Sequence, residues 1–176
     1  GRLMATGSDD STIMLWAPDG EEPLATLEGH ENGILDMALS RDGCRLFSCG
    51  YDATVRVWDM GSRTLLSTMK GHKRPVQAVD ISPDGTQMVS GDLDGIAKLW
   101  RVPSGQGTAF LKGHANWVYS AAFHPGSVQL VSVGIPEFHS EREKSKDVPT
   151  MFVWNAVDGR RLSLQKMDKS RASSVA

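Results

Sequence analysis

The stretch Ser48-Cys-Gly-Tyr-Asp-Ala-Thr-Val-Arg-Val-Trp58 passes from a small-residue turn into an apolar run that ends on a tryptophan. Similar stretches end at Trp16, Trp100 and Trp154, so the four tryptophans are spaced by 42, 42 and 54 residues. Gly-His pairs repeat with the same period, at Gly29-His30, Gly71-His72 and Gly113-His114. A fixed period of this size indicates one supersecondary unit repeated several times, so we expect the chain to fold as an array.

Each unit contains four short runs with the composition of β-strands. Around the second tryptophan, residues 44–49 and 54–58 flank the turn and predict a hairpin. The run 34–39 precedes this hairpin and ends at a turn rich in Asp and Gly, and the run 64–69 follows it. Four antiparallel strands in about 42 residues are typical of one blade of a β-propeller.

These repeated motifs make the chain similar to the WD-repeat (WD40) β-propeller family, although only Trp58-Asp59 keeps the literal Trp-Asp pair. The resemblance implies an all-β fold, a partial propeller over residues 1–166. It comprises three complete four-stranded blades at about 33–69, 75–111 and 117–166, and a partial N-terminal blade at 1–28. Residues 135–149 are an inserted charged loop between two strands of the last blade, and residues 167–176 are a Ser-rich, basic tail that we expect to be flexible.

Three complete blades and a partial one cannot close a ring, because propellers close with about four to eight blades. The chain also begins with Gly1 rather than Met, inside a repeat. We therefore expect a piece of a larger WD-repeat protein, with the missing blades supplied by the rest of the parent chain or by a partner.

The composition and the spacing of particular residues limit which binding partners and which cellular compartment we expect for this protein. With 19 Lys+Arg against 21 Asp+Glu the net charge is −2, so direct nucleic-acid binding is not favoured. No apolar run approaches the roughly 20 residues that span a bilayer, and no membrane association is predicted. Cys44 and Cys49 lack a CxxC spacing, which fits a reducing compartment, cytoplasmic or nuclear. The five histidines lack metal-ligand spacing, and no phosphate-binding loop is present, so no metal or cofactor is expected.

His30, Ser48 and Asp52 are the residue types of a hydrolase triad. However, His72, Ser90 and Asp94 repeat the same separations, and a catalytic site has no reason to recur in every blade. The family resemblance implies instead a structural hydrogen-bonded tetrad with the following tryptophan. We assign it to His30, Ser48, Asp52 and Trp58, and to His72, Ser90, Asp94 and Trp100. The last unit keeps His114, Ser132 and Trp154, but Val148 occupies the aspartate position, so either Asp147 substitutes or the network is incomplete.

The rim that carries the Gly-His loops is the surface on which most WD-repeat propellers hold peptides. Trp117 and Tyr119 flank Val118 at the start of an inner strand, so alternation predicts that both rings point the same way, unless one or both pack inside the blade. Tyr51 and the cations Lys73 and Arg74 are expected on the same rim, and Phe138 on the inserted loop. These six residues are the predicted partner-binding set.

The predicted function is a non-catalytic protein–protein interaction scaffold that docks partner peptides or domains on this rim. One alternative is the substrate receptor of a ubiquitin ligase, although the Arg that such proteins place two residues after Trp-Asp is replaced here by Gly61, Pro103 and Val157. Another is a subunit of a ribonucleoprotein or ribosome-assembly complex. An enzyme is the least favoured class.

Overall fold

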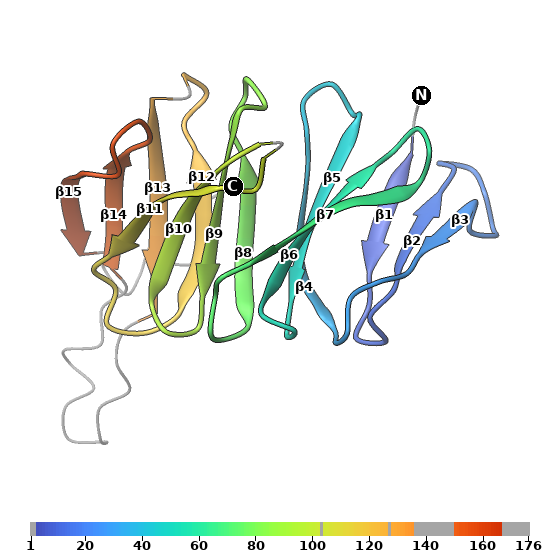
Figure 1. Cartoon of the computed structure of the whole chain (residues 1–176), viewed down its shortest axis with the longest axis horizontal. Helices are drawn as coiled ribbons and strands as arrows, with labels where there is room; N and C mark the ends of the chain where they lie inside the picture. Colours follow the sequence, from blue (N-terminus) through green and yellow to red (C-terminus); the bar gives the residue numbers. More distant parts are fainter. Residues whose placement is uncertain (1–2, 103, 127, 136–149, 167–176) are drawn as a thin grey trace.

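The computed structural model of the chain describes residues 3–102, 104–126, 128–135 and 150–166. These residues form four antiparallel sheets and no helix, and the sheets follow one another along the chain (Figure 1). Sheet 1 contains β1 (Met4–Gly7), β2 (Ile13–Trp16) and β3 (Ala25–Leu27). Sheet 2 contains β4 (Ile34–Leu39), β5 (Arg45–Gly50), β6 (Thr54–Asp59) and β7 (Thr64–Lys70). Sheet 3 contains β8 (Val76–Ile81), β9 (Gln87–Asp92), β10 (Ile96–Arg101) and β11 (Gly107–Lys112). Sheet 4 contains β12 (Val118–Phe123), β13 (Gln129–Gly134), β14 (Thr150–Asn155) and β15 (Arg161–Lys166).

This architecture confirms the predicted fold class, with three four-stranded sheets and a three-stranded N-terminal sheet that do not close into a ring. In every sheet the strands are paired in chain order, so each is an up-and-down meander. The predicted insertion and tail fall almost entirely on residues 136–149 and 167–176, outside the described residues. Among the described residues, no helix is long and apolar enough to cross a membrane.

Each sheet has two different faces, because side chains alternate along a strand. The tryptophan face of sheet 2 carries Leu46 opposite Trp58 and Ser48 opposite Arg56. Its other side, which we call the aliphatic face, carries Phe47 opposite Val57 and Cys49 opposite Val55. The same two sets recur in the other three sheets at the corresponding register positions.

The core lies between the sheets. Three buried clusters form, and in each the aliphatic face of one sheet packs against the tryptophan face of the next. In the first cluster, for example, Ile13 and Leu15 of sheet 1 join Leu46 and Trp58 of sheet 2. Burial of apolar surface at these three junctions therefore holds the array together.

The inner strands β4, β8 and β12 each contain a bulge one residue after their first residue, at Leu35, Gln77 and Tyr119. An extra residue in one strand interrupts the alternation of side chains. The regular alternation on which the orientation of Trp117 and Tyr119 was predicted is therefore interrupted at Tyr119, and the direction of the two rings stays a prediction.

Candidate functional site

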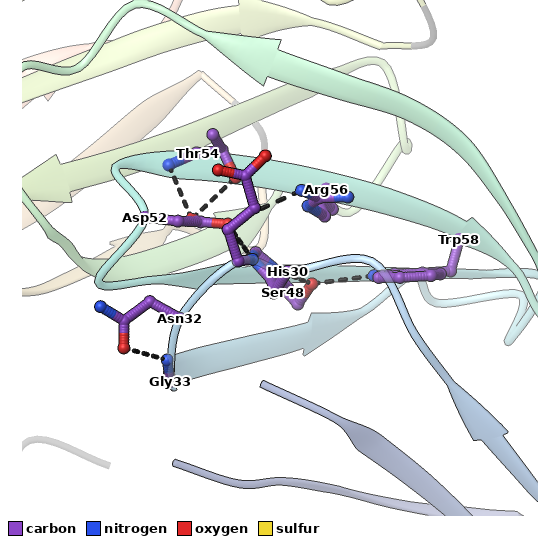
Figure 2. A network of polar contacts seen from close by, with 9 residues as sticks. His30, Asn32, Gly33, Ser48, Asp52, Thr54, Arg56 and Trp58 are labelled. Carbon is purple, nitrogen blue, oxygen red and sulfur yellow. Dashed lines mark hydrogen bonds and ion pairs between the residues drawn. The ribbon is translucent and has the colours of Figure 1, made fainter. Parts of the chain in front are cut away.

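A chain of hydrogen bonds runs through sheet 2 from the indole of Trp58 to the carboxylate of Asp52 (Figure 2). Trp58 Nε1 donates to Ser48 Oγ at 2.8 Å, and Ser48 Oγ lies 2.7 Å from His30 Nε2. On the other side of the ring, His30 Nδ1 lies 2.8 Å from Asp52 Oδ2. The structure thus brings together the four residues assigned to the first tetrad.

The positions of the protons in this series of hydrogen bonds follow from the residues at its two ends, Trp58 and Asp52. An indole N–H can only donate, so the Ser48 hydroxyl points its own proton at His30 Nε2, and Nδ1–H donates to Asp52. Burial lowers the pKa of His30, more than its contact with Asp52 raises it. Burial alone would raise the pKa of Asp52, but hydrogen bonds from His30, Glu31 and Thr54 lower it below its usual value. A neutral imidazole beside a carboxylate anion is the resulting charge state at neutral pH.

The order Ser–His–Asp is that of a hydrolase triad, but the surroundings are not. The Ser48 side chain is completely buried, and its oxygen already accepts a hydrogen bond from the Trp58 indole N–H. A substrate carbonyl cannot approach a hydroxyl that is enclosed in this way. The contacts suit a network that ties the Gly-His loop to the hairpin behind it.

In sheet 3 the predicted aspartate was wrong. His72 Nε2 lies 2.7 Å from Ser90 Oγ, and Trp100 Nε1 donates to the same oxygen at 2.8 Å, as the family resemblance implied. His72 Nδ1, however, lies 2.6 Å from Asp92 rather than contacting Asp94. Asp94 is half-exposed, and Arg74 Nε lies 3.5 Å from its carboxylate on the surface.

The local sequence explains why Asp92, and not Asp94, contacts His72. In sheet 2, Asp52 Oδ1 accepts from both the main-chain N–H and the hydroxyl of Thr54, whereas the corresponding residue of sheet 3, Ile96, has no hydroxyl. Asp92 lies at the end of β9, and its Oδ1 accepts from the main-chain N–H of Asp94 and of Ile96. The corresponding position of sheet 2 is Gly50, which has no side chain to offer.

Sheet 4 has the histidine, serine and tryptophan but not the carboxylate. His114 Nε2 lies 2.7 Å from Ser132 Oγ, and Trp154 Nε1 donates to the same oxygen at 2.8 Å. His114 Nδ1 contacts the hydroxyl of Thr150 at 3.1 Å, a partner that was not predicted. With no anion beside it, burial lowers the pKa of His114 to about 4. The candidate Asp147 and the neighbouring Val148 lie outside the described residues.

Two buried cations in the networks were also missed. Arg56 Nη2 lies 3.7 Å from Asp52 Oδ2 beneath the Gly-His loop, and Lys98, one period later, donates to the Gly71 carbonyl. Gly29 and Gly71 have φ values of +154° and +149°. A Cβ on Gly29 would lie 2.8 Å from Arg56 Nη1, so the glycine of the Gly-His pair leaves room for the side chain two residues before the tryptophan.

Adjacent inner strands are joined by two further carboxylates. Asp36 of β4 accepts from the main-chain N–H of Val79 in β8 at 2.9 Å, and Asp80 of β8 accepts from Phe123 in β12 at 2.7 Å. Burial raises the pKa of both carboxyl groups, against the opposing effect of these hydrogen bonds. Their sequence positions differ within the repeat, so periodicity gave no signal for them.

The rim residues lie where the Gly-His loops meet the hairpin turns. Main-chain hydrogen bonds join Tyr51 to Gly33, Leu93 to Pro75 and Ile135 to Trp117 at this end of the sheets. Trp117, Tyr51 and Tyr119 are 39%, 47% and 60% exposed, so none of the three rings is packed in a blade interior. Lys73 and Arg74 are also exposed, and Phe138 lies outside the described residues.

No group of three or more His, Cys, Asp or Glu side chains in the described part of the chain is arranged to hold a metal ion.

The four-stranded meander sheets and their recurring Trp–Ser–His hydrogen bonds are those of blades of a WD-repeat β-propeller. The model of the WD40 family, described as "WD domain, G-beta repeat", matches residues 1–17, 21–59, 63–101 and 105–134. These segments cover more than half of the sequence, and the chain belongs to the WD40 family.

Curated relatives match over single short regions. The chain is 39% identical over 56 residues to the probable cytosolic iron-sulfur protein assembly protein 1 of Eremothecium gossypii, covering 28% of this chain and 17% of that protein. It is 40% identical over 68 residues to Protein HIR1 of Cryptococcus neoformans, covering 30% and 8%. It is 39% identical over 51 residues to ribosome assembly protein 4 of Chaetomium thermophilum, covering 28% and 10%. The matches thus span less than a fifth of each of these relatives.

Proposed function

We propose that the chain is a non-catalytic scaffold that docks partner peptides or domains on the rim formed by the Gly-His loops and hairpin turns. The observation that carries this proposal is the exposure of Trp117, Tyr119 and Tyr51 at one rim of the β array. Large aromatic side chains give much binding energy for little lost conformational freedom, and they are enriched in interaction hot spots. Exposed Lys73 and Arg74 on the same rim would favour an acidic segment beside the aromatic contacts.

Membership of the WD40 family supports the same conclusion, since such repeats typically mediate protein interactions without catalysis. Two of the relatives are named as assembly proteins, which fits a subunit of a multiprotein complex in the cytoplasm or nucleus. The name "ribosome assembly protein 4" keeps a ribonucleoprotein complex as the second candidate. Loss of co-purifying RNA at raised salt, with the protein partners retained, would distinguish RNA contact from protein contact.

The test is affinity capture from a lysate with the Trp117→Ala/Tyr119→Ala double variant, with bound proteins quantified by mass spectrometry. We expect at least a tenfold loss of specific partners and an unchanged β circular-dichroism spectrum. Leu66→Ala, which shortens an exposed side chain on the outer strand β7, is the matched control and should capture as wild type. Undiminished capture by the double variant would refute the rim assignment.

The Ser48→Ala variant tests the proposal that the protein is not an enzyme. Removing a buried hydroxyl that both accepts from Trp58 and donates to His30 should lower the melting temperature. A hydrolytic activity in the wild type that Ser48→Ala abolishes without loss of stability would overturn this part of the proposal.

A further inference from the structure

The Gly-His loop of sheet 2 ends in an asparagine followed by a glycine, Asn32-Gly33, which is the one Asn-Gly pair in the sequence. An asparagine side chain in this setting is chemically unstable, because the following main-chain nitrogen can attack the side-chain carbonyl carbon. Glycine has no side chain to obstruct that attack. Whether the reaction takes place in the folded protein depends on how the loop holds the two residues.

The structure places the two reacting groups in contact. The Gly33 N–H donates to Asn32 Oδ1 at 2.8 Å, so the nitrogen lies beside the Cγ atom that carries this oxygen (Figure 2). In the described part of the chain this N–H has no other acceptor, so the attack breaks no hydrogen bond of the sheet. On one side of the pair the Glu31 N–H donates to Asp52. On the other side the Gly33 carbonyl accepts from the Tyr51 N–H, so the main chain is held at both flanks of the contact.

Water reaches the side chain, and packing requires the glycine. Asn32 is exposed. The equivalent residue of the next repeat, Arg74, stands between two complete four-stranded sheets and its side chain is 60% exposed, so exposure is a property of this loop position. Gly33 is buried against sheet 1, and a Cβ there would lie 3.0 Å from both Cα and Oδ1 of Asp9. A larger residue after Asn32 would therefore clash with sheet 1.

Asn116, two repeat periods after Asn32, has the same hydrogen bond but a different successor. Its Oδ1 accepts from the Trp117 N–H at 2.9 Å. The attacking nitrogen here belongs to a residue with a large side chain, which hinders closure of a ring, and Asn116 is itself half-buried. The chain thus contains a matched pair of asparagines that differ mainly in the residue that follows.

We propose that Asn32 is a site of deamidation in the folded protein. The Gly33 nitrogen gives its proton to a base in the solvent and forms a bond to Asn32 Cγ. The bond from Cγ to the side-chain nitrogen then breaks, and this nitrogen takes up a proton and leaves as ammonia. Water opens the resulting cyclic succinimide at either carbonyl and gives aspartate or isoaspartate. The reaction consumes water and releases ammonia without an oxidant or reductant, and it adds a negative charge to the Gly-His loop.

The added charge falls on the rim assigned to docking, so its consequence for binding rests on the proposed function. Lys73 and Arg74 on that rim attract an acidic segment, and an anion at position 32 repels it. Isoaspartate also lengthens the main chain directly before Gly33, whose carbonyl holds the turn that carries Tyr51. Deamidation is therefore a slow, one-way reduction of affinity for an acidic partner.

The test is incubation of the full folded chain at mildly alkaline pH, followed by tryptic mapping with mass spectrometry. Deamidation raises the mass of a peptide by about 1 Da, and chromatography separates its isoaspartate form. We expect Asn32 to react at least tenfold faster than Asn116, and Trp117→Gly should make Asn116 react as well. Circular dichroism of each sample checks that the chain stays folded, and a sample in urea gives the rate at Asn32 without the fold.

An Asn32 that stays intact in the folded chain but reacts in urea would overturn the proposal. Equal rates at Asn32 and Asn116 in the folded wild type would overturn it too, as would an Asn116 that stays intact in folded Trp117→Gly.

The effect on docking has a separate measurement. Asn32→Asp, which fixes one product in the sequence, should bind the partners of the wild type about threefold more weakly, whereas the uncharged Asn32→Gln should bind as wild type. Deamidation without this loss would refute the effect on docking alone. Normal binding by Trp117→Ala/Tyr119→Ala would refute the proposed function and leave the deamidation site in place.

Discussion

Asp92 and Asp94 lie two residues apart in the same turn, and only Asp92 reaches His72. Repeat register favours Asp94, because it aligns with Asp52 of the preceding sheet. The choice depends on which main-chain N–H groups the turn leaves without partners, and Asp92 accepts from two of them. Residue-level chemistry of this kind decides how each network is completed.

Asp92→Ala should therefore destabilise the protein more than Asp94→Ala. The first change leaves the buried His72 Nδ1–H and two turn N–H groups without their acceptor, at a cost of about 1–3 kcal/mol. The second removes a half-exposed carboxylate, for which surface substitutions typically change stability by less than about 0.5 kcal/mol. Urea unfolding of both variants measures the difference, and equal midpoints would contradict the assignment of Asp92.

The network of sheet 4 should make stability depend on pH through His114. Its pKa is about 4 in the folded protein against 6.5 for an ordinary histidine, so the unfolded chain takes up the proton first as pH falls. The stability that this neutral, buried ring contributes is complete above pH 6.5 and is lost progressively down to about pH 4. The loss should reach about 3 kcal/mol, since each pKa unit is worth about 1.4 kcal/mol.

Denaturant titrations between pH 7 and 4 on wild type and His114→Asn give this contribution as a difference. The gap between the two proteins should shrink as pH falls, because the variant lacks the titrating ring. Contributions from His30 and the carboxyl groups are common to both proteins and cancel. A gap that stays constant over this range would contradict the low pKa.

At the scale of elements, the turn between the second and third strands recurs with the same backbone and different residues. Ser11, Ala53 and Gly95 lie 42 residues apart and have φ values of +75°, +60° and +76°. Ser11 and Ala53 carry a Cβ in this conformation. A Cβ on Gly95, by contrast, would lie 2.6 Å from the His114 carbonyl oxygen of the next Gly-His loop. The turn of sheet 3 thus packs directly against sheet 4.

Gly95→Ala and Ala53→Gly form a matched pair for this turn. Gly95→Ala should cost 2 kcal/mol or more, on the order of the left-handed backbone penalty of about 1–2 kcal/mol plus the displaced loop. Ala53→Gly removes that penalty but raises the conformational entropy of the unfolded chain. The two effects oppose each other, so the variant should change stability by less than about 1 kcal/mol. Thermal unfolding of the two variants measures these changes in stability. Equal changes would contradict the contact between this turn and the next sheet.

The strands and their order could be predicted from the sequence because the 42-residue period, the turn residues and the tryptophans all mark the same boundaries. The pairing of His30, Ser48 and Asp52 was implied by the resemblance to the WD-repeat family, and their repeated spacing argued against a catalytic site. The bulge at Tyr119, the use of Asp92 and the Thr150 contact could not be predicted, because they depend on local main-chain geometry. Asp36 and Asp80 escaped prediction for another reason, since their hydrogen bonds cross between sheets at positions that do not repeat.

At the scale of the whole molecule, the proposed function assigns stability and recognition to different parts of the array. The three buried junctions and the Trp–Ser–His chains are enclosed, whereas the aromatic rim residues are exposed. Under the proposed function, a scaffold of this kind would meet its partner with little ordering of its own chain, which reduces the entropic cost of binding. Changes in one part should therefore leave the other nearly unaltered.

The most direct test of this separation is a paired measurement of melting temperature and partner affinity on Ser90→Ala and on Trp117→Ala/Tyr119→Ala. Ser90 is completely buried between His72 and Trp100, so its loss should lower the melting temperature by several degrees while the folded protein keeps its affinity. The rim variant should keep its melting temperature within about a degree and lose at least tenfold in affinity. If Ser90→Ala abolishes binding at temperatures where it is folded, or if the rim variant binds normally, the separation of a structural interior from a recognising rim is contradicted.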